Sequence, residues 1–125
     1  MTKPILELEH ITKKYPGVVA LDDVSISFYP GEVHAIVGEN GAGKSTLIKL
    51  ITGAISPTSG KILYEGNEIT DNNPEKAIEL GITAVYQELN LLKHLSVAEN
   101  IYFNRYPKKH GFVDYRKMDF YKGLY

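Results

Sequence analysis

The feature that most constrains the fold is a glycine-rich stretch at residues 38–45, with the sequence GENGAGKS. It follows a short apolar run at residues 33–37, which is typical of a strand buried on both faces. Residues 44–52 then carry apolar side chains at helical spacing, and Gly53 stands where a helix would end. The sequence therefore predicts a strand, a glycine loop and a helix in direct succession.

The stretch matches the phosphate-binding pattern G-x-x-x-x-G-K-[ST], in which backbone amides converge on a polyphosphate. Glycines leave those amides accessible and tolerate positive φ, and the helix that follows adds its dipole and unpaired N–H groups. Lys44 would bring a charge to the β- and γ-phosphates, and Ser45 a hydroxyl to Mg²⁺. The alternative is a glycine-rich turn with an exposed lysine. The candidate phosphate-binding residues are Gly38, Glu39, Asn40, Gly41, Ala42, Gly43, Lys44 and Ser45.

Composition excludes several other classes of protein. The 125 residues are 43% hydrophobic and 23% charged, which is typical of a globular domain. There is no cysteine, so we expect no disulfide, thiolate nucleophile or Cys-based metal site. His10, His94 and His110 lack metal-ligand spacing, and His34, inside the predicted strand at 33–37, is expected to pack in the core. No apolar run reaches the roughly 20 residues of a membrane span, and no signal peptide is apparent.

Charge is uneven along the chain. Residues 1–104 carry eight Lys and thirteen Asp or Glu, whereas residues 105–125 carry six Lys or Arg and two Asp. A basic tail can be a nucleic-acid arm, but the net charge of −1 argues against a nucleic-acid partner. We interpret the tail as a solvated, Tyr-rich surface segment.

The remaining pattern indicates an α/β fold with a small β-rich part at the front. A helix is predicted between Asn73 and Gly81, and a second buried strand at residues 82–86. Ser96-x-x-Glu99 is a capping box that opens a helix, and Asp114 is a candidate cap for a last one. The front strands are expected at residues 5–11, 24–28 and 61–64.

Five blocks of sequence stand in this order: residues 15–21 (YPGVVAL), 38–46 (GENGAGKST), 57–60 (PTSG), 85–88 (VYQE) and 95–100 (LSVAEN). Together they resemble the ATP-binding cassette (ABC) ATPases, most closely the monosaccharide importers. The resemblance implies a P-loop NTPase fold, with the front antiparallel β subdomain and the first part of the parallel core sheet present. It also implies that residues 1–104 form the N-terminal half of one nucleotide-binding domain, followed by a basic tail at 105–125.

Further site residues follow from the resemblance. Tyr15 occupies the position of the aromatic residue that stacks on adenine, although a loop aromatic packed on Pro16 is the alternative. Thr46 matches a hydroxyl near the α-phosphate, and Ser45 matches the Mg²⁺ ligand. Gln87 matches the glutamine that approaches Mg²⁺ and the attacking water, unless it simply meets solvent.

The resemblance also implies partners and a location. We expect ATP and Mg²⁺ as cofactors, a second cassette, and a transmembrane permease subunit contacted by residues 88–100. The leucines of that segment could form a docking surface or belong to the core. The full-length protein would hydrolyse ATP to drive sugar uptake, in the cytoplasm on the inner face of the cell membrane.

The sequence departs from the family pattern after Asn104. Neither a serine-glycine-glycine signature motif nor a strand ending in Asp and a catalytic Glu appears. We therefore expect the isolated chain to be inactive, and its unpaired central strand to promote self-association. A non-catalytic nucleotide-binding fragment and a P-loop small-molecule kinase are the alternatives, the kinase being disfavoured by the blocks at 57–60 and 87–100.

Overall fold

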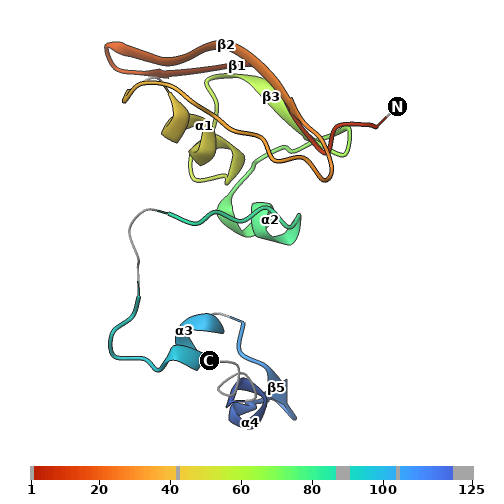
Figure 1. The fold of residues 1–125 in the computed structure, drawn as a ribbon, viewed down its shortest axis with the longest axis vertical. Helices are drawn as coiled ribbons and strands as arrows, with labels where there is room; N and C mark the ends of the chain where they lie inside the picture. Colours follow the sequence, from red (N-terminus) through yellow and green to blue (C-terminus); the bar gives the residue numbers. More distant parts are fainter. Residues whose placement is uncertain (1, 42, 87–90, 104, 120–125) are drawn as a thin grey trace. The chain divides into compact units, whose positions relative to one another are not determined.

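The computed structural model describes residues 2–41, 43–86, 91–103 and 105–119 (Figure 1). By its internal contacts the chain divides into two compact units, Met1–Val85 and Tyr86–Tyr125. No helix among these described residues is both long and apolar enough to cross a membrane.

The first unit is built on a four-stranded antiparallel sheet of order β2-β1-β3-β4. Tyr15 pairs with Val18 across a two-residue turn, where Gly17 has a φ of 76°. The strand predictions at 5–11, 24–28 and 61–64 are confirmed, and each strand extends further than its apolar alternation suggested. The strands are β1 (Leu6–Tyr15), β2 (Val18–Phe28), β3 (Ser59–Tyr64) and β4 (Asn67–Glu68).

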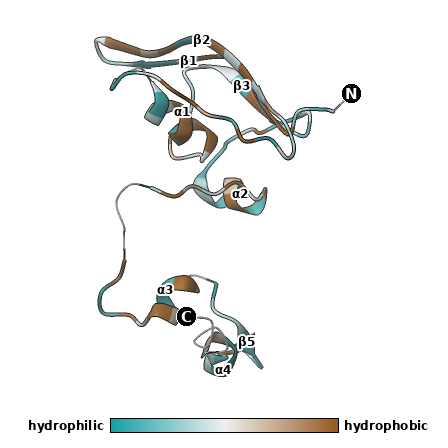
Figure 2. Cartoon of the chain, viewed as in Figure 1, coloured by the Kyte–Doolittle hydropathy of each residue, from teal (hydrophilic) through white to brown (hydrophobic). Residues whose placement is uncertain are grey.

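Helix α1 (Lys44–Ile51) packs on one face of this sheet, as Figure 1 shows. Leu50 and Ile11 are fully buried in the cluster between them, and each such side chain contributes about 1.5–3 kcal/mol through burial. The hydropathy colouring of Figure 2 shows apolar residues on both α1 and the strands. The cluster consists of Leu6, Leu8, Ile11, Leu21, Leu47, Leu50, Ile51 and Ile62.

Helix α2 (Pro74–Glu79) begins where the sequence predicted it. The Asn73 side chain accepts a hydrogen bond of 2.9 Å from the Lys76 amide, which caps the helix, and Pro74 occupies its first turn. The preceding Asn72 donates from Nδ2 to the Leu50 carbonyl at 3.2 Å, and so ties the entry of α2 to the last turn of α1.

Two predicted strands are absent. Residues 33–37 and 82–86 form no strand, and the side chains of Val33, Val37 and Val85 are 100%, 88% and 98% exposed. A central parallel strand forms only when neighbouring strands bond to its backbone and helices cover its faces. Among the described residues nothing does so for either segment. Ile36 and Ile82 pack against the core cluster, but the three valines are left almost fully exposed.

The prediction for His34 is wrong for the same reason. Its ring is not in the core but contacts the edge of Phe28, with ring centroids 4.8 Å apart, and Nδ1 lies 3.6 Å from the Glu32 carboxylate.

The second unit holds α3 (Val97–Ile101), β5 (Lys108–Lys109), β6 (Phe112–Val113) and α4 (Tyr115–Asp119). The predicted capping box is confirmed: the Ser96 hydroxyl accepts from the Glu99 amide, and the Glu99 carboxylate accepts from the Ser96 amide at 2.8 Å. The predicted cap of the last helix is also confirmed, because Asp114 Oδ1 accepts from the Lys117 amide at 3.2 Å.

Candidate functional site

The glycine loop ends in close contact with the start of β2. Gly43 has a φ of 93°, and a Cβ placed on it would lie 2.7 Å from the Ala20 carbonyl oxygen and 2.8 Å from Leu21 Cδ2. Gly41 also has a positive φ, of 84°, but a Cβ there would meet nothing within 4 Å. Glycine at 43 is therefore required both by backbone conformation and by packing.

The first turn of α1 offers its backbone donors to an anion. Gly43 is the N-cap, so no side chain caps the helix, and the first turn contains no acidic residue. Leu47 donates its amide to the Gly43 carbonyl at 2.9 Å, which leaves the preceding amides of the helix without an intrahelical acceptor. The positive end of the helix dipole is directed to the same place.

A hollow of about 190 Å³ lies at this helix start. It brings together most of the loop residues predicted from the sequence, while Ala42 and Gln87 lie outside the described residues. The sequence did not identify the wall formed by the first residues of β2, because only the tertiary packing of β2 against the loop places them there. The lining residues are Val18, Val19, Ala20, Asn40, Gly41, Gly43, Lys44, Ser45 and Thr46.

The Lys44 ammonium is directed across the loop. Its Nζ donates to the carbonyl oxygen of Gly38 and, at 2.7 Å, to that of Glu39. Gly38 and Glu39 thus contribute to the site by accepting hydrogen bonds from Lys44, and they do not line the hollow. Phosphate oxygens are stronger acceptors than neutral carbonyls, so an anion in the hollow would compete for this ammonium.

Tyr15 lies at the end of β1, beside the hollow but not in its lining. Its ring is 42% exposed, and the Lys13 ammonium lies 5.2 Å from the ring centroid, within cation–π range. The hairpin that begins at Tyr15 continues directly into Val18 and Val19 of the lining. A partly exposed aromatic residue is therefore the strand partner of Val18, which lines the hollow.

The residues present fit a polyphosphate with a divalent cation. Backbone amides, the Lys44 ammonium and the hydroxyls of Ser45 and Thr46 border one hollow, and no acidic side chain is among its described lining residues. Such a set supplies donors and positive charge for phosphate oxygens, and the Ser45 hydroxyl is a suitable ligand for Mg²⁺.

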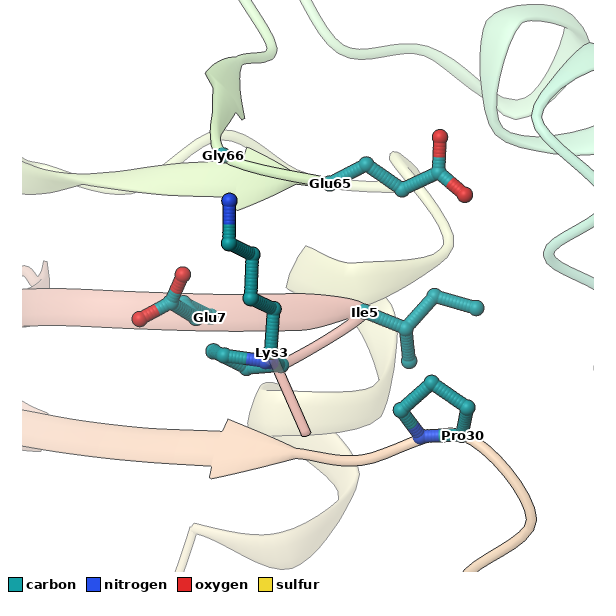
Figure 3. A pocket seen from close by; sticks show the side chains of 7 residues that line it. Lys3, Ile5, Glu7, Pro30, Glu65 and Gly66 are labelled. Atoms are coloured by element: carbon teal, nitrogen blue, oxygen red, sulfur yellow. The ribbon is translucent and has the colours of Figure 1, made fainter. Parts of the chain in front are cut away.

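A second hollow, of about 320 Å³, lies at the opposite end of β1 (Figure 3). Lys3, Glu7 and Glu65 contribute its charged side chains, together with apolar surface from Ile5 and Pro30. Two carboxylates against one ammonium give no attraction for an anion, so this hollow is not a second phosphate site.

Comparison with known proteins identifies the family of the chain. The model of the ABC transporter family matches residues 21–122. The chain belongs to the ABC transporter family. The family resemblance of the five sequence blocks is therefore confirmed. The ATPases of this family hydrolyse ATP.

Curated ABC relatives include sugar-import ATP-binding proteins. The chain is 50% identical, over 94% of its length, to a ribose import ATP-binding protein of Rubrobacter xylanophilus. It is also 50% identical, over 93% of its length, to a galactose/methyl galactoside import ATP-binding protein of Fusobacterium nucleatum. In both cases the chain spans about 23% of the length of the relative.

Solved ABC structures share the fold. A nucleotide-free ATP-binding cassette of an ABC transporter matches with a TM-score of 0.75 and 36% identity, covering 97% of this chain and 47% of that one. Another cassette gives a TM-score of 0.77 and 34% identity, covering 98% and 53%. The predicted fold class, a partial α/β P-loop domain with a front antiparallel sheet, is confirmed.

Proposed function

We propose that the chain binds MgATP in the hollow at the start of α1, as part of an ATP-binding subunit that drives sugar import. The observation that carries the proposal is the convergence of uncapped helix amides, a glycine backbone and the Lys44 ammonium on one hollow of about 190 Å³. The sugar-import part rests on the names of the relatives, which include ribose and galactose import proteins.

Each site residue has a defined task in this proposal. Lys44 exchanges the carbonyls of Gly38 and Glu39 for the β- and γ-phosphate oxygens, and the exchange stabilises the bound nucleotide. Ser45 holds Mg²⁺, Thr46 approaches the α-phosphate, and Tyr15 offers its ring to adenine. Bound MgATP supplies a phosphoryl group for transfer to water, and Gln87 is assigned to positioning that water.

The proposal extends to the assembly. Residues 1–104 would belong to the N-terminal half of one nucleotide-binding domain, and residues 105–125 would follow it as a basic tail. Residues 88–100 would contact a transmembrane permease subunit on the inner face of the cell membrane, and a second cassette would complete the ATP site. Leu91, in that segment, is 62% exposed, which is consistent with a docking surface.

Binding without turnover is the second candidate for a protein of these 125 residues. The observation that favours it is the absence of acidic side chains from the described lining of the hollow. Without a carboxylate to polarise the attacking water, the site can hold a nucleotide but lacks a main element of catalysis.

Titration calorimetry with MgATP tests the proposal. Lys44→Ala should lower the affinity by about one to two decades, because a charge-assisted contact is worth about 1.5–3 kcal/mol. Lys49→Ala is the matched control: Lys49 lies on the exposed side of the last turn of α1, away from the hollow. Equal affinities for the wild type and Lys44→Ala would show that the loop is not the phosphate site.

A further inference from the structure

The second unit carries a basic hollow of its own. Hairpin β5–β6 and the start of α4 enclose about 480 Å³, with Lys109, His110 and Arg116 contributing the basic side chains. The amide of Asp114 donates to the Pro107 carbonyl at 2.7 Å, which ties the start of α4 back to the start of the hairpin (Figure 1). Basic groups from two separate elements therefore face one solvent-accessible surface.

The charge of this surface is largely uncompensated. Lys108 and Lys117 adjoin the hollow in sequence, and no ion pair involves them, Lys109 or Arg116 among the residues that the structure describes. Asp114 is the acidic residue of the lining, and its carboxylate accepts the Lys117 amide at the start of α4. The surface consequently presents a net positive charge, whereas residues 1–104 are net negative.

Two aromatic rings border the same hollow and project into solvent. Phe112 is 79% exposed and Tyr115 is 61% exposed. Exposed aromatic side chains next to lysines and arginines are the combination found where proteins contact a membrane interface, because the rings partition to headgroup level while the cations meet lipid phosphates. A freely solvated face needs no such rings.

We propose that this surface, formed by residues 108–117, binds the anionic headgroups of a phospholipid membrane. The inference rests on the proposed function insofar as that function places the chain beside a permease. Charge complementarity selects an anionic partner, and the exposed Phe112 favours a lipid interface over an extended polyanion.

Vesicle sedimentation of the full 125-residue chain tests the proposal. We expect binding to vesicles of 30% phosphatidylserine in phosphatidylcholine at least about tenfold tighter than to pure phosphatidylcholine, and weakened by salt. Each basic residue near an anionic surface is worth about fivefold, so Lys108→Glu with Lys109→Glu should weaken binding by about 25-fold or more. Phe112→Ser should also weaken vesicle binding, and this loss should remain at high salt, because the substitution removes an apolar contact and not a charge.

The matched control is Lys3→Glu with Lys14→Glu, an equal charge change at exposed positions of the first unit, which should alter vesicle binding less than about twofold. If the wild type binds the two vesicle types equally, the proposal is wrong. This result does not depend on whether any variant folds. An equal loss in the control pair also overturns it. Binding of a single-stranded oligonucleotide without binding to phosphatidylserine vesicles assigns the surface to nucleic acid and overturns it as well.

Calorimetry with MgATP separates this proposal from the function on which it rests. Lys108→Glu with Lys109→Glu should keep the wild-type ATP affinity, because neither residue borders the hollow at α1. Vesicle binding without ATP binding would refute the proposed function alone, and ATP binding without a preference for anionic vesicles would refute the membrane surface alone.

Discussion

Gly43 and Lys44 are neighbours in the loop, but different physical constraints act on them. At position 43 there is no room for a side chain, since a Cβ would lie against the Ala20 carbonyl. The Lys44 side chain is held by its charge: its ammonium donates to two loop carbonyls, next to a helix start that no side chain caps. The first residue therefore matters for stability and the second for binding, and the two effects can be measured separately.

Gly43→Ala should destabilise the fold by about 2 kcal/mol more than Gly41→Ala, the usual cost of forcing extra atoms into a packed position. Both substitutions force alanine into a positive φ, but only the one at 43 also places a Cβ against the backbone of β2. Urea unfolding followed by circular dichroism would measure the difference. An equal loss of stability in the two variants would mean that the contact with Ala20 is not a constraint.

At the scale of elements, the helix starts were predicted well and the central strands were not. The caps at Asn73, Ser96 and Asp114 each act on an amide three residues away, so the local sequence contains everything that they need. The segments 33–37 and 82–86 need partners distant in the sequence, and the apolar pattern alone cannot show whether those partners are in place.

The capping box of α3 should lower the pKa of the Glu99 carboxyl. The amide of Ser96, and then its hydroxyl, hold the pKa of Glu99 below its ordinary value. Because the folded pKa is lowered, the stabilisation from this carboxylate is complete above the ordinary Glu range and is lost as the pH falls through the lower folded value.

NMR titration of the Glu99 carboxyl, in buffer and in urea, would measure this shift. The folded value should be the lower one, and Ser96→Ala should reduce the difference, because it removes the cap that holds the first turn in place. Equal values in buffer and urea would contradict the role assigned to the box.

At the scale of the whole molecule, apolar side chains remain without a covering layer. Val33, Val37 and Val85 belong to segments whose pattern is that of a buried sheet, yet they are almost fully exposed. Each such side chain would gain about 1.5 kcal/mol or more on burial, so contact between copies of the chain is favourable.

A protein of these 125 residues should therefore self-associate. Sedimentation velocity over a concentration series should show species larger than the monomer, and Val33→Asp with Val37→Asp should shift them toward monomer. Val97→Asp with Ile101→Asp, at exposed positions of α3, is the matched control and should change association less. A clean monomer of the wild type at high concentration would be evidence against this expectation.

The same protein should hydrolyse ATP no faster than the uncatalysed reaction within assay error. No acidic side chain is among the described residues that line the loop hollow, and each missing electrostatic group typically costs about two to three decades in rate. A phosphate-release assay on highly purified chain, with Lys44→Ala as control, measures this. Turnover that disappears in Lys44→Ala would contradict the prediction.

The sequence by itself determined what depends on near neighbours: the glycine loop, the helix that follows it, the front strands and the caps. These need only local spacing, the tolerance of glycine for positive φ and hydrogen bonds over three or four residues. The pattern at 38–45 and the five blocks were also sufficient to identify the family.

Tertiary structure alone decided what depends on distant partners. It placed Val18, Val19 and Ala20 against the loop, turned the Lys44 ammonium onto the Gly38 and Glu39 carbonyls, and left His34 outside the core. It also left residues 33–37 without strand neighbours. The physical reason is that hydrophobic burial and strand pairing each need two surfaces in contact. The pattern of one segment describes its own surface and not that of its partner.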